Sequence, residues 1–375
     1  MPNTGLANIS AGETAICRVD PAGQLHYRGY DVKDLCAHAS YEEVAYLLIY
    51  GELPDQDQLS HYRNRLAHLR VLPYPARHLL ELIPPTASPM DVLRTACSFL
   101  GTIAPESPEF SGKEIADHLV ALLPSALLYW HHFHHSAIKI NTESNALSTA
   151  EFFLDTLFQS KTDPLLVSML DQSLILFAEH EFNASTFSAR VTTGTNSDFY
   201  SAICSAIGTL KGPLHGEAIS QAYKLITRFP EPEQALVGVK AMLTNQETIP
   251  GFGHRVYHDS DPRAVIMKQW ADKLSSHSSN HRLYDLSETI EKLMREEGNS
   301  FPNVDFYTAT TYSTANIPVS LFAPIFAVAR VTGWSAHILE QRENNTLIRP
   351  VADYIGPNAK AFLPLDERQS VKEAN

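Results

Sequence analysis

The sequence has few cysteines, and none of them lie close together along the chain. Among 375 residues only Cys17, Cys36, Cys97 and Cys204 occur, and they form no C-x-x-C pair. This spacing favours neither a disulfide framework nor a structural zinc site. The chain also lacks a basic start followed by an apolar segment, and it has no run of about 18 apolar residues. We therefore expect a soluble, cytoplasmic protein.

Positive charge is also scarce. Lysine and arginine number 29 against 42 aspartates and glutamates, which gives a formal net charge of −13. This balance excludes nucleic-acid binding through a broad basic face. Neither a G-x-G-x-x-G dinucleotide motif nor a G-x-x-x-x-G-K-[ST] phosphate loop is present. An anionic ligand would have to be held by arginines that are concentrated locally.

Strand-like alternation is rare, and signals for helices dominate. Residues 14–30, "TAICRVDPAGQLHYRGY", alternate around a D-P-A-G turn and predict a short hairpin. Ser40 with Glu43 forms a capping box, and Pro89 and Pro164 follow capping residues at helix starts. The length of the chain favours two domains. Glycine-rich "LKGPLHG" near 210–216 and "FPNVDFYTA" near 301–309 are the candidate boundaries.

The segment 248–264, "TIPGFGHRVYHDSDPRA", combines turn residues with two histidines and two arginines. Its glycines allow the backbone to approach a ligand closely, and arginine suits bidentate binding of a carboxylate. Further arginines follow at Arg330, Arg342 and Arg349. Ordinary surface solubility is the alternative explanation for each arginine taken alone.

Two further motifs contain residues suited to acid–base chemistry. In "GPLHGEA", His215 lies at an expected helix start, where the amide dipoles favour a neutral ring that can donate a hydrogen bond to an enolate. In "PNVDFY", apolar neighbours would raise the pKa of Asp305 and make it a useful base. A capping or core histidine and a helix-capping aspartate are the alternatives.

The segment "WHHFHH" at 130–135 is a different kind of candidate. His131 and His135 have the i, i+4 spacing of metal ligands on a helix, but no acidic residue lies near them in the sequence. A solvated or interfacial helix face is the alternative interpretation. The sequence therefore leaves open a metal-binding or scaffold protein without catalytic activity.

Six segments together resemble the citrate synthase family. They are "HYRGYD" (26–31), "AEHEFNASTFSAR" (178–190), "GPLHG" (212–216), "GFGHRVY…DPR" (251–263), "PNVDFY" (302–307) and "ARVTGWSAHILEQR…IRP" (329–350). The resemblance implies a mainly α, two-domain helical fold with the short N-terminal β-hairpin. It also implies a homodimer with shared active sites. Residues 1–215 and 309–375 would form the large, dimer-forming domain, and residues 216–308 the small inserted domain.

The resemblance implies an enzyme that condenses an acyl-CoA with oxaloacetate and uses neither a metal nor a cofactor. Within the family the chain is most similar to the 2-methylcitrate synthases, through "LHYRGYD", "SPMDVLRTA", "LLYWHH", "EHEFNASTF" and "RVTGWSAHILEQR". The expected reaction joins propionyl-CoA, oxaloacetate and water to give 2-methylcitrate and CoA, with acetyl-CoA also accepted to give citrate. The alternative is a citrate synthase that prefers acetyl-CoA.

The resemblance also assigns roles to individual residues. Asp305 matches the base, His215 the residue that hydrogen-bonds the thioester oxygen, and His254 the one that polarises the ketone of oxaloacetate. Residues His180, Arg263 and Arg330 match oxaloacetate contacts, and Arg349 matches an arginine given by the second subunit. The residues expected to contact CoA are Ile249, Pro250, Gly251, Phe252, Gly253, Arg255 and His258.

Three positions depart from the family pattern. After His215 the chain has "HGEAI", so Glu217 and Ile219 stand where a small residue and an amide are common. These residues could alter the orientation of His215 or the neighbouring CoA contacts. At position 258 a histidine replaces the usual lysine or arginine, which predicts CoA binding that is weaker or more dependent on pH.

Overall fold

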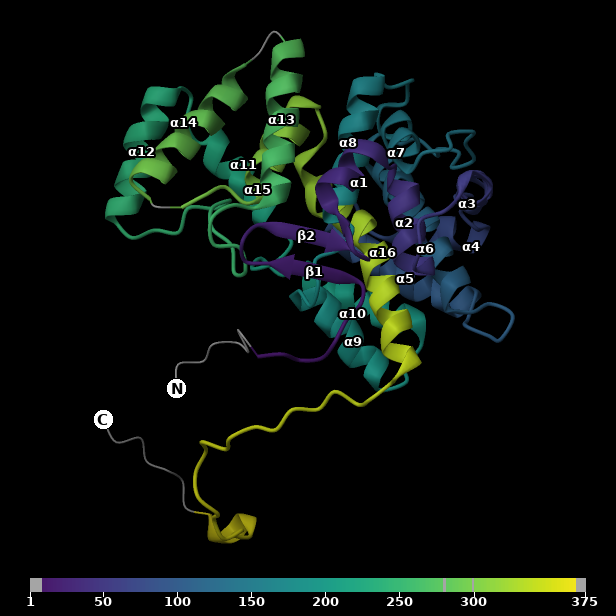
Figure 1. Ribbon diagram of the computed structural model, residues 1–375. Helices are drawn as coiled ribbons and strands as arrows, with labels where there is room; N and C mark the ends of the chain where they lie inside the picture. The colour runs from purple at the N-terminus through teal and green to yellow at the C-terminus, as the bar shows by residue number, and fades with distance from the viewer. Residues whose placement is uncertain (1–8, 279–280, 299, 369–375) are drawn as a thin grey trace.

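The computed structural model describes residues 9–278, 281–298 and 300–368, and most of this chain is helical (Figure 1). The N-terminal sheet has three antiparallel strands in the order β1 (Cys17–Asp20), β2 (Gln24–Tyr27) and β3 (Tyr30–Asp31). The expected hairpin is therefore confirmed, with Cys17 opposite Tyr27, and a third short strand extends it. Gly23 closes the hairpin turn at a φ of 88°, a conformation that favours glycine.

Two groups of helices follow the sheet in Figure 1. The larger group contains α1 (Val32–His38), α2 (Tyr41–Tyr50), α3 (Gln56–Leu69), α4 (Tyr74–Leu82), α5 (Pro89–Ile103), α6 (Gly112–His135), α7 (Thr149–Phe158), α8 (Pro164–Phe177), α9 (Ala184–Gly194), α10 (Phe199–Leu210) and α16 (Phe322–Glu343). The second group contains α11 (Ala218–Thr227), α12 (Pro232–Thr244), α13 (Pro262–His277), α14 (Arg282–Glu296) and α15 (Val304–Thr314). Short 3₁₀ helices occupy Val319–Leu321 and Leu365–Glu367.

Two of the three predicted helix caps appear in the structure, while Ser88 precedes Pro89 at the start of α5 without making a side-chain cap hydrogen bond. At α2 the Ser40 hydroxyl accepts the N–H of Glu43, and the Glu43 carboxylate accepts the N–H of Ser40. Asp163 caps α8 in front of Pro164. Helix α5 continues past Gly101 to Ile103, because an isolated glycine is tolerated inside a helix whose apolar face is packed.

Helix α16 runs through the centre of the larger group and packs against α2, α6, α8 and α9. Among the described residues, only the stretch Val319–Glu343 is long and apolar enough to cross a membrane by length and composition. However, 83% of its most apolar window is buried inside the molecule. Its apolar character is therefore explained by its position as the core helix of this fold.

Gly333 lies where α16 crosses the segment that ends α8. A Cβ atom at this position would overlap the carbonyl oxygen of Ala178 and the carboxylate of Glu179. Only glycine therefore allows α16 to approach the backbone just before His180. Through this contact, the packing of the core helix fixes the position of a candidate site residue.

We expect Gly333→Ala to destabilise the protein by about 1–3 kcal/mol, because the added methyl group forces α16 away from residues 178–179. The matched control is Gly208→Ala in α10, where the nearest atom to the new Cβ is 3.8 Å away. There, alanine should be neutral or should stabilise the helix by up to about 1 kcal/mol. Thermal unfolding of both variants tests this, and equal melting temperatures would contradict it.

Candidate active site

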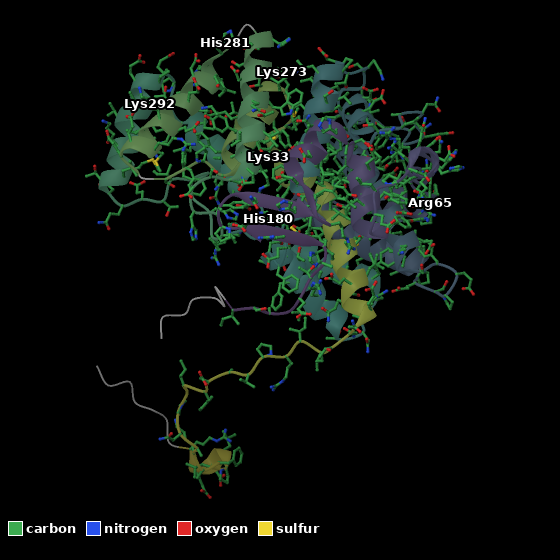
Figure 2. All side chains as sticks on the ribbon, viewed as in Figure 1. Lys33, Arg65, His180, Lys273, His281 and Lys292 are labelled. Carbon is green, nitrogen blue, oxygen red and sulfur yellow. The ribbon has the colours of Figure 1, made fainter. Side chains whose placement is uncertain are left out.

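The candidate site residues come from separate parts of the chain and meet where the two groups of helices adjoin. Figure 2 shows His180 in this region, while Arg65, for example, lies far from it on the larger group. The segments that contribute are the turn after α8 (His180), the turn between α10 and α11 (His215), the loop before α13 (His254), the first turn of α13 (Arg263), the first turn of α15 (Asp305) and the middle of α16 (Arg330).

Two buried arginines give the site its positive charge. Arg263 is 4% exposed, and its Nε and Nη2 donate to the two carboxylate oxygens of Asp261 at 3.0 and 2.9 Å. Arg330 is 1% exposed, donates to the carbonyl of Phe177 and lies 4.7 Å from the centre of the Phe326 ring. Both arginines influence the protonation of His180 and Asp305, so all four residues lie within electrostatic range of one another.

His254 is neutral and its tautomer is fixed. Its Nδ1 accepts hydrogen bonds from the backbone N–H groups of Val256 and Tyr257, at 3.1 and 3.2 Å. Burial, with the positive charge of Arg263 nearby, lowers the pKa of His254 to about 4. Because Nδ1 is an acceptor, the single proton of the neutral ring lies on Nε2. The ring therefore presents an N–H donor to a ligand.

His180 lies beside His254 and is connected to the same loop. The two ring centres are 5.2 Å apart, and the Tyr257 hydroxyl lies 3.1 Å from Nε2 of His180. Tyr257 also stacks on His254, with ring centres 4.5 Å apart. Burial and then Arg263 lower the pKa of His180 well below its usual value. Tyr257 therefore holds both imidazoles in one arrangement.

His215 does not lie at the start of a helix as the sequence predicts. Helix α11 begins three residues later at Ala218, and His215 lies in the preceding turn. Its pKa is nevertheless lowered to about 4, because the ring is buried and Arg330 is close. The expected neutral state is therefore obtained by desolvation and a nearby cation.

Ser185 orients the His215 ring. Its hydroxyl lies 2.9 Å from Nε2 of His215 and 2.7 Å from the Asn183 amide oxygen, while the indole N–H of Trp334 donates to it at 3.1 Å. The single proton of Ser185 thus has two acceptors within reach, Asn183 and His215. When this proton faces His215, the proton of the imidazole lies on Nδ1.

Asp305 has the properties of a general base. Its backbone N–H is capped by Asn303, and its partly accessible carboxylate makes no side-chain hydrogen bond within the described ranges. Burial raises the pKa of this carboxyl to about 6, although Arg263 and Arg330 act in the opposite direction. Such a carboxylate is ionised at neutral pH and is a stronger base than an ordinary aspartate.

The glycine-rich loop lies directly next to the segment that leads into Asp305. The N–H of Gly253 donates to the carbonyl of Phe301, and the N–H of Asn303 donates to the carbonyl of Gly251. Both glycines have positive φ angles, 88° and 76°, and a Cβ at Gly251 would come within 2.9 Å of the Phe306 Cβ. Glycine is therefore required at positions 251 and 253. The loop is completed by Ile249, which is buried, and by Pro250 and Phe252.

The remaining predicted residues lie in different places. Arg255 and His258 are exposed on the loop between His254 and α13, and the His258 N–H donates to the Pro21 carbonyl in the hairpin turn. Arg349 lies on an exposed extended segment that projects away from the helices (Figure 1). Within one chain the structure therefore does not bring Arg349 to the other site residues.

The two departures after His215 have separate locations. Ile219 is 1% exposed and packs in the core of the second group of helices, while Glu217 is exposed at the start of α11. Ile219 therefore stabilises the core of the second group of helices. Arg342, which the sequence groups with the other arginines, pairs with Glu106 instead.

The histidine-rich end of α6 has structural partners. Ring nitrogens of His132 and His134 lie 2.9 Å from the Thr156 carbonyl and 3.1 Å from the Leu80 carbonyl. The rings of His131 and His135 are 5.1 Å apart. In the part of the chain that the structure describes, no group of three or more His, Cys, Asp or Glu side chains is arranged to hold a metal ion.

Several functional candidates carry no recognisable signal in the sequence on their own. Asp261, Ser185, Tyr257 and Trp334 become site residues only through the contacts described above. In addition, Arg190 Nε donates to His337 Nδ1 at 2.9 Å, and His337 Nε2 donates to Glu179 at 2.9 Å. Only the three-dimensional structure connects these separated segments.

Several known proteins are similar to this chain over most of its length. A family model described as "Citrate synthase, C-terminal domain" matches residues 5–351. A 2-methylcitrate synthase from Shewanella oneidensis is 46% identical over 98% of both chains, and citrate synthase 2 from Bacillus subtilis is 41% identical over 92% of this chain and 93% of its own. Among solved structures, a citrate synthase from Thermoplasma acidophilum superimposes on this chain with a TM-score of 0.90. Its sequence is 29% identical, and the match covers 97% of this chain and 98% of that one. That structure is a ternary complex with carboxymethyl coenzyme A and oxaloacetate.

This chain therefore belongs to the citrate synthase family, and it is an acyl-CoA:oxaloacetate condensing enzyme of that family. The mainly helical fold that the sequence predicts is confirmed.

We expect Asp305→Asn to stabilise the protein at pH 8 by about 2 kcal/mol while removing its activity. The folded-state pKa of about 6 is higher than that of the unfolded chain, so ionisation of this largely desolvated carboxyl opposes folding above this pH. The gain should shrink as the pH falls through 6 toward 4. Melting curves at pH 8 and pH 5 measure it, with the exposed Asp353→Asn as control. A gain independent of pH would contradict this explanation.

Proposed function

We propose that this enzyme condenses propionyl-CoA with oxaloacetate and water to give 2-methylcitrate and CoA, and that it also accepts acetyl-CoA to give citrate. The observation that carries the reaction type is the arrangement of Asp305, with its raised pKa, beside two buried arginines and three neutral histidines. The preference for propionyl-CoA is supported by the 46% identical 2-methylcitrate synthase and by the motifs of the sequence.

Oxaloacetate is a dianion, and the buried cations Arg263 and Arg330 are its proposed ligands. In an acidic protein these two guanidinium groups supply a local positive field that the overall charge does not. His180 completes this pocket as a neutral hydrogen-bonding partner. His254 would donate its Nε2–H to the ketone oxygen and so make the carbonyl carbon more electrophilic.

Asp305 would then remove the α-proton of the acyl thioester. With the Ser185 proton facing Nε2, His215 would carry its own proton on Nδ1 and would donate a hydrogen bond to the thioester oxygen as the enolate forms. The enolate carbon attacks the ketone, and His254 supplies a proton to the new alkoxide. Hydrolysis of the resulting thioester by water releases CoA and the tricarboxylate product.

The loop Ile249–Gly253, with Arg255 and His258, is the proposed CoA-binding surface. Its hydrogen bonds to Phe301 and Asn303 would link CoA binding to the position of Asp305, two residues further along the chain. We also propose that residues 216–308 form a small domain that closes over the substrates and excludes water before bond formation. The proposed boundary at 308 lies inside α15, whose packing on α11 and α13 would carry Asp305 with the moving group.

We further propose a homodimer in which Arg349 reaches the partner's site. The extended segment that follows α16 exposes apolar side chains such as Val351, Ile355 and Phe362, which are 86, 96 and 83% exposed. Such a run of exposed apolar residues is unfavourable in water and is typical of a segment that packs against another surface. A second copy of this chain would cover it and would receive Arg349.

Initial rates of CoA thiol release at saturating oxaloacetate test the substrate preference. We expect kcat/KM for propionyl-CoA to exceed that for acetyl-CoA by about tenfold or more, since recognition of one methylene group contributes about 1–3 kcal/mol. Asp305→Ala provides the blank. A clear preference for acetyl-CoA would make this enzyme a citrate synthase and would reject the proposed donor.

Mixing two inactive variants tests the shared site. Asp305→Asn and Arg349→Gln should each be inactive, but a heterodimer contains one site with both native residues. After the subunits are exchanged at equal concentrations, about one quarter of the wild-type activity should return, because half of the dimers are mixed and each has one intact site. If Arg349 acts within its own chain, mixing will restore nothing.

A further inference from the structure

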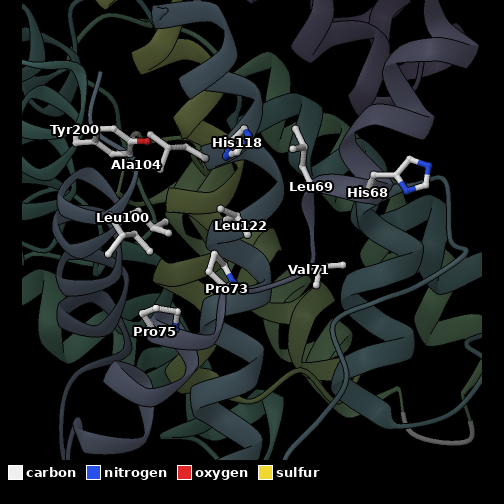
Figure 3. Close-up of a pocket in the computed structure, with 12 residues that line it drawn as sticks. His68, Leu69, Val71, Pro73, Pro75, Leu100, Ala104, His118, Leu122 and Tyr200 are labelled. Carbon is white, nitrogen blue, oxygen red and sulfur yellow. The ribbon is translucent and has the colours of Figure 1, made fainter. Parts of the chain in front are cut away.

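A cavity of about 350 Å³ lies in the larger group of helices, and none of the candidate site residues lines it (Figure 3). It is formed by the connection between α3 and α4, the end of α5, the first half of α6 and the start of α10. Leu100, Leu119 and Leu122 are buried and form its apolar interior. Val71 and Ile103, 47 and 38% exposed, lie at its rim.

Three polar side chains line this apolar cavity, namely the exposed His68 and the more buried His118 and Tyr200. Tyr200 is only 3% exposed, and its hydroxyl has no hydrogen-bond partner among the described residues. Figure 3 shows the Tyr200 oxygen directed toward the side of the cavity where His118 lies. His118 contacts the Phe110 ring edge-on, at 4.8 Å between ring centres. Burial and then Arg65 lower the pKa of His118, so its ring is a neutral donor and acceptor.

The position of Tyr200 is fixed by a glycine. A Cβ at Gly101 in α5 would come within 2.9 Å of Cγ of Tyr200, so the phenol ring packs directly on the backbone of α5. The hydroxyl is the part of Tyr200 that reaches the cavity, and no hydrogen bond joins it to another side chain among the described residues. It is therefore free to donate to, or accept from, a molecule that enters the cavity.

We propose that this cavity is a binding site for a small uncharged molecule with an apolar ring and one hydrogen-bonding group of the phenol class. The hydrogen-bonding group would lie between Tyr200 and His118, and the ring would contact the leucine side chains. No lysine or arginine lines the cavity, so it has no counter-charge for an anion in this acidic protein. Its volume lies in the range of ligand sites.

The test compares p-cresol with toluene, which differ only by the hydroxyl group, by isothermal titration calorimetry on the full-length protein. We expect p-cresol to bind about fivefold or more tightly than toluene, the difference that one net hydrogen bond supplies. In Tyr200→Phe this preference should disappear while toluene binding remains. The control variant Tyr223→Phe, which lies outside the cavity, should retain the preference.

A second variant distinguishes this cavity from other apolar surfaces. Ala104→Phe places a ring in the cavity and should abolish the binding of both compounds, while kcat/KM for the acyl-CoA stays unchanged. Equal affinity of the wild type for p-cresol and toluene would overturn the proposal, as would a preference that persists in Tyr200→Phe. Failure of both compounds to bind the wild type would also overturn it.

Discussion

The carboxylate of Asp261 holds two proposed site residues in one rigid unit. They are Arg263, which is proposed to bind oxaloacetate, and Asp305, the proposed base. Asp261 is 1% exposed, pairs with the Arg263 side chain through both oxygens and accepts the backbone N–H of the same residue. Its second oxygen also accepts the N–H of Val304 at 3.0 Å, one residue before Asp305. One buried side chain thus caps α13, fixes Arg263 and positions the start of α15.

The charges of the site are balanced by a small number of buried acids. Asp261 faces Arg263, and Glu179 lies near Arg330 and receives the N–H of His337. Burial and these arginines keep His180, His215 and His254 neutral. Because the imidazoles carry no charge, they do not compete with the arginines for the carboxylates of Asp261 and Glu179. The site therefore combines fixed positive charge with neutral hydrogen-bond donors, which is what the proposed binding of a dianion and the proposed reaction require. A net charge of −13 over the whole chain is compatible with this because the cations are buried and local.

Much of the fold could be predicted from the sequence because its signals are local. The D-P-A-G turn, the Ser40–Glu43 capping box and the Asp163–Pro164 helix start all appear as expected. The neutral state of His215 was predicted for the wrong reason, since burial and Arg330, not a helix start, lower its pKa. The roles of Asp261, Tyr257 and Ser185 were missed because they depend on contacts between distant segments. Arg349 lies on the projecting segment, so the role proposed for it requires a partner chain.

The kinetics of Asp261→Asn would test most directly whether this one carboxylate couples the oxaloacetate pocket to the base. Asparagine keeps the size of the side chain but removes the charge that pairs with Arg263. In variant protein shown to be folded by circular dichroism, the account predicts that KM for oxaloacetate rises and kcat falls, each by about tenfold or more. A folded variant in which both constants stay within about twofold of the wild type would contradict it.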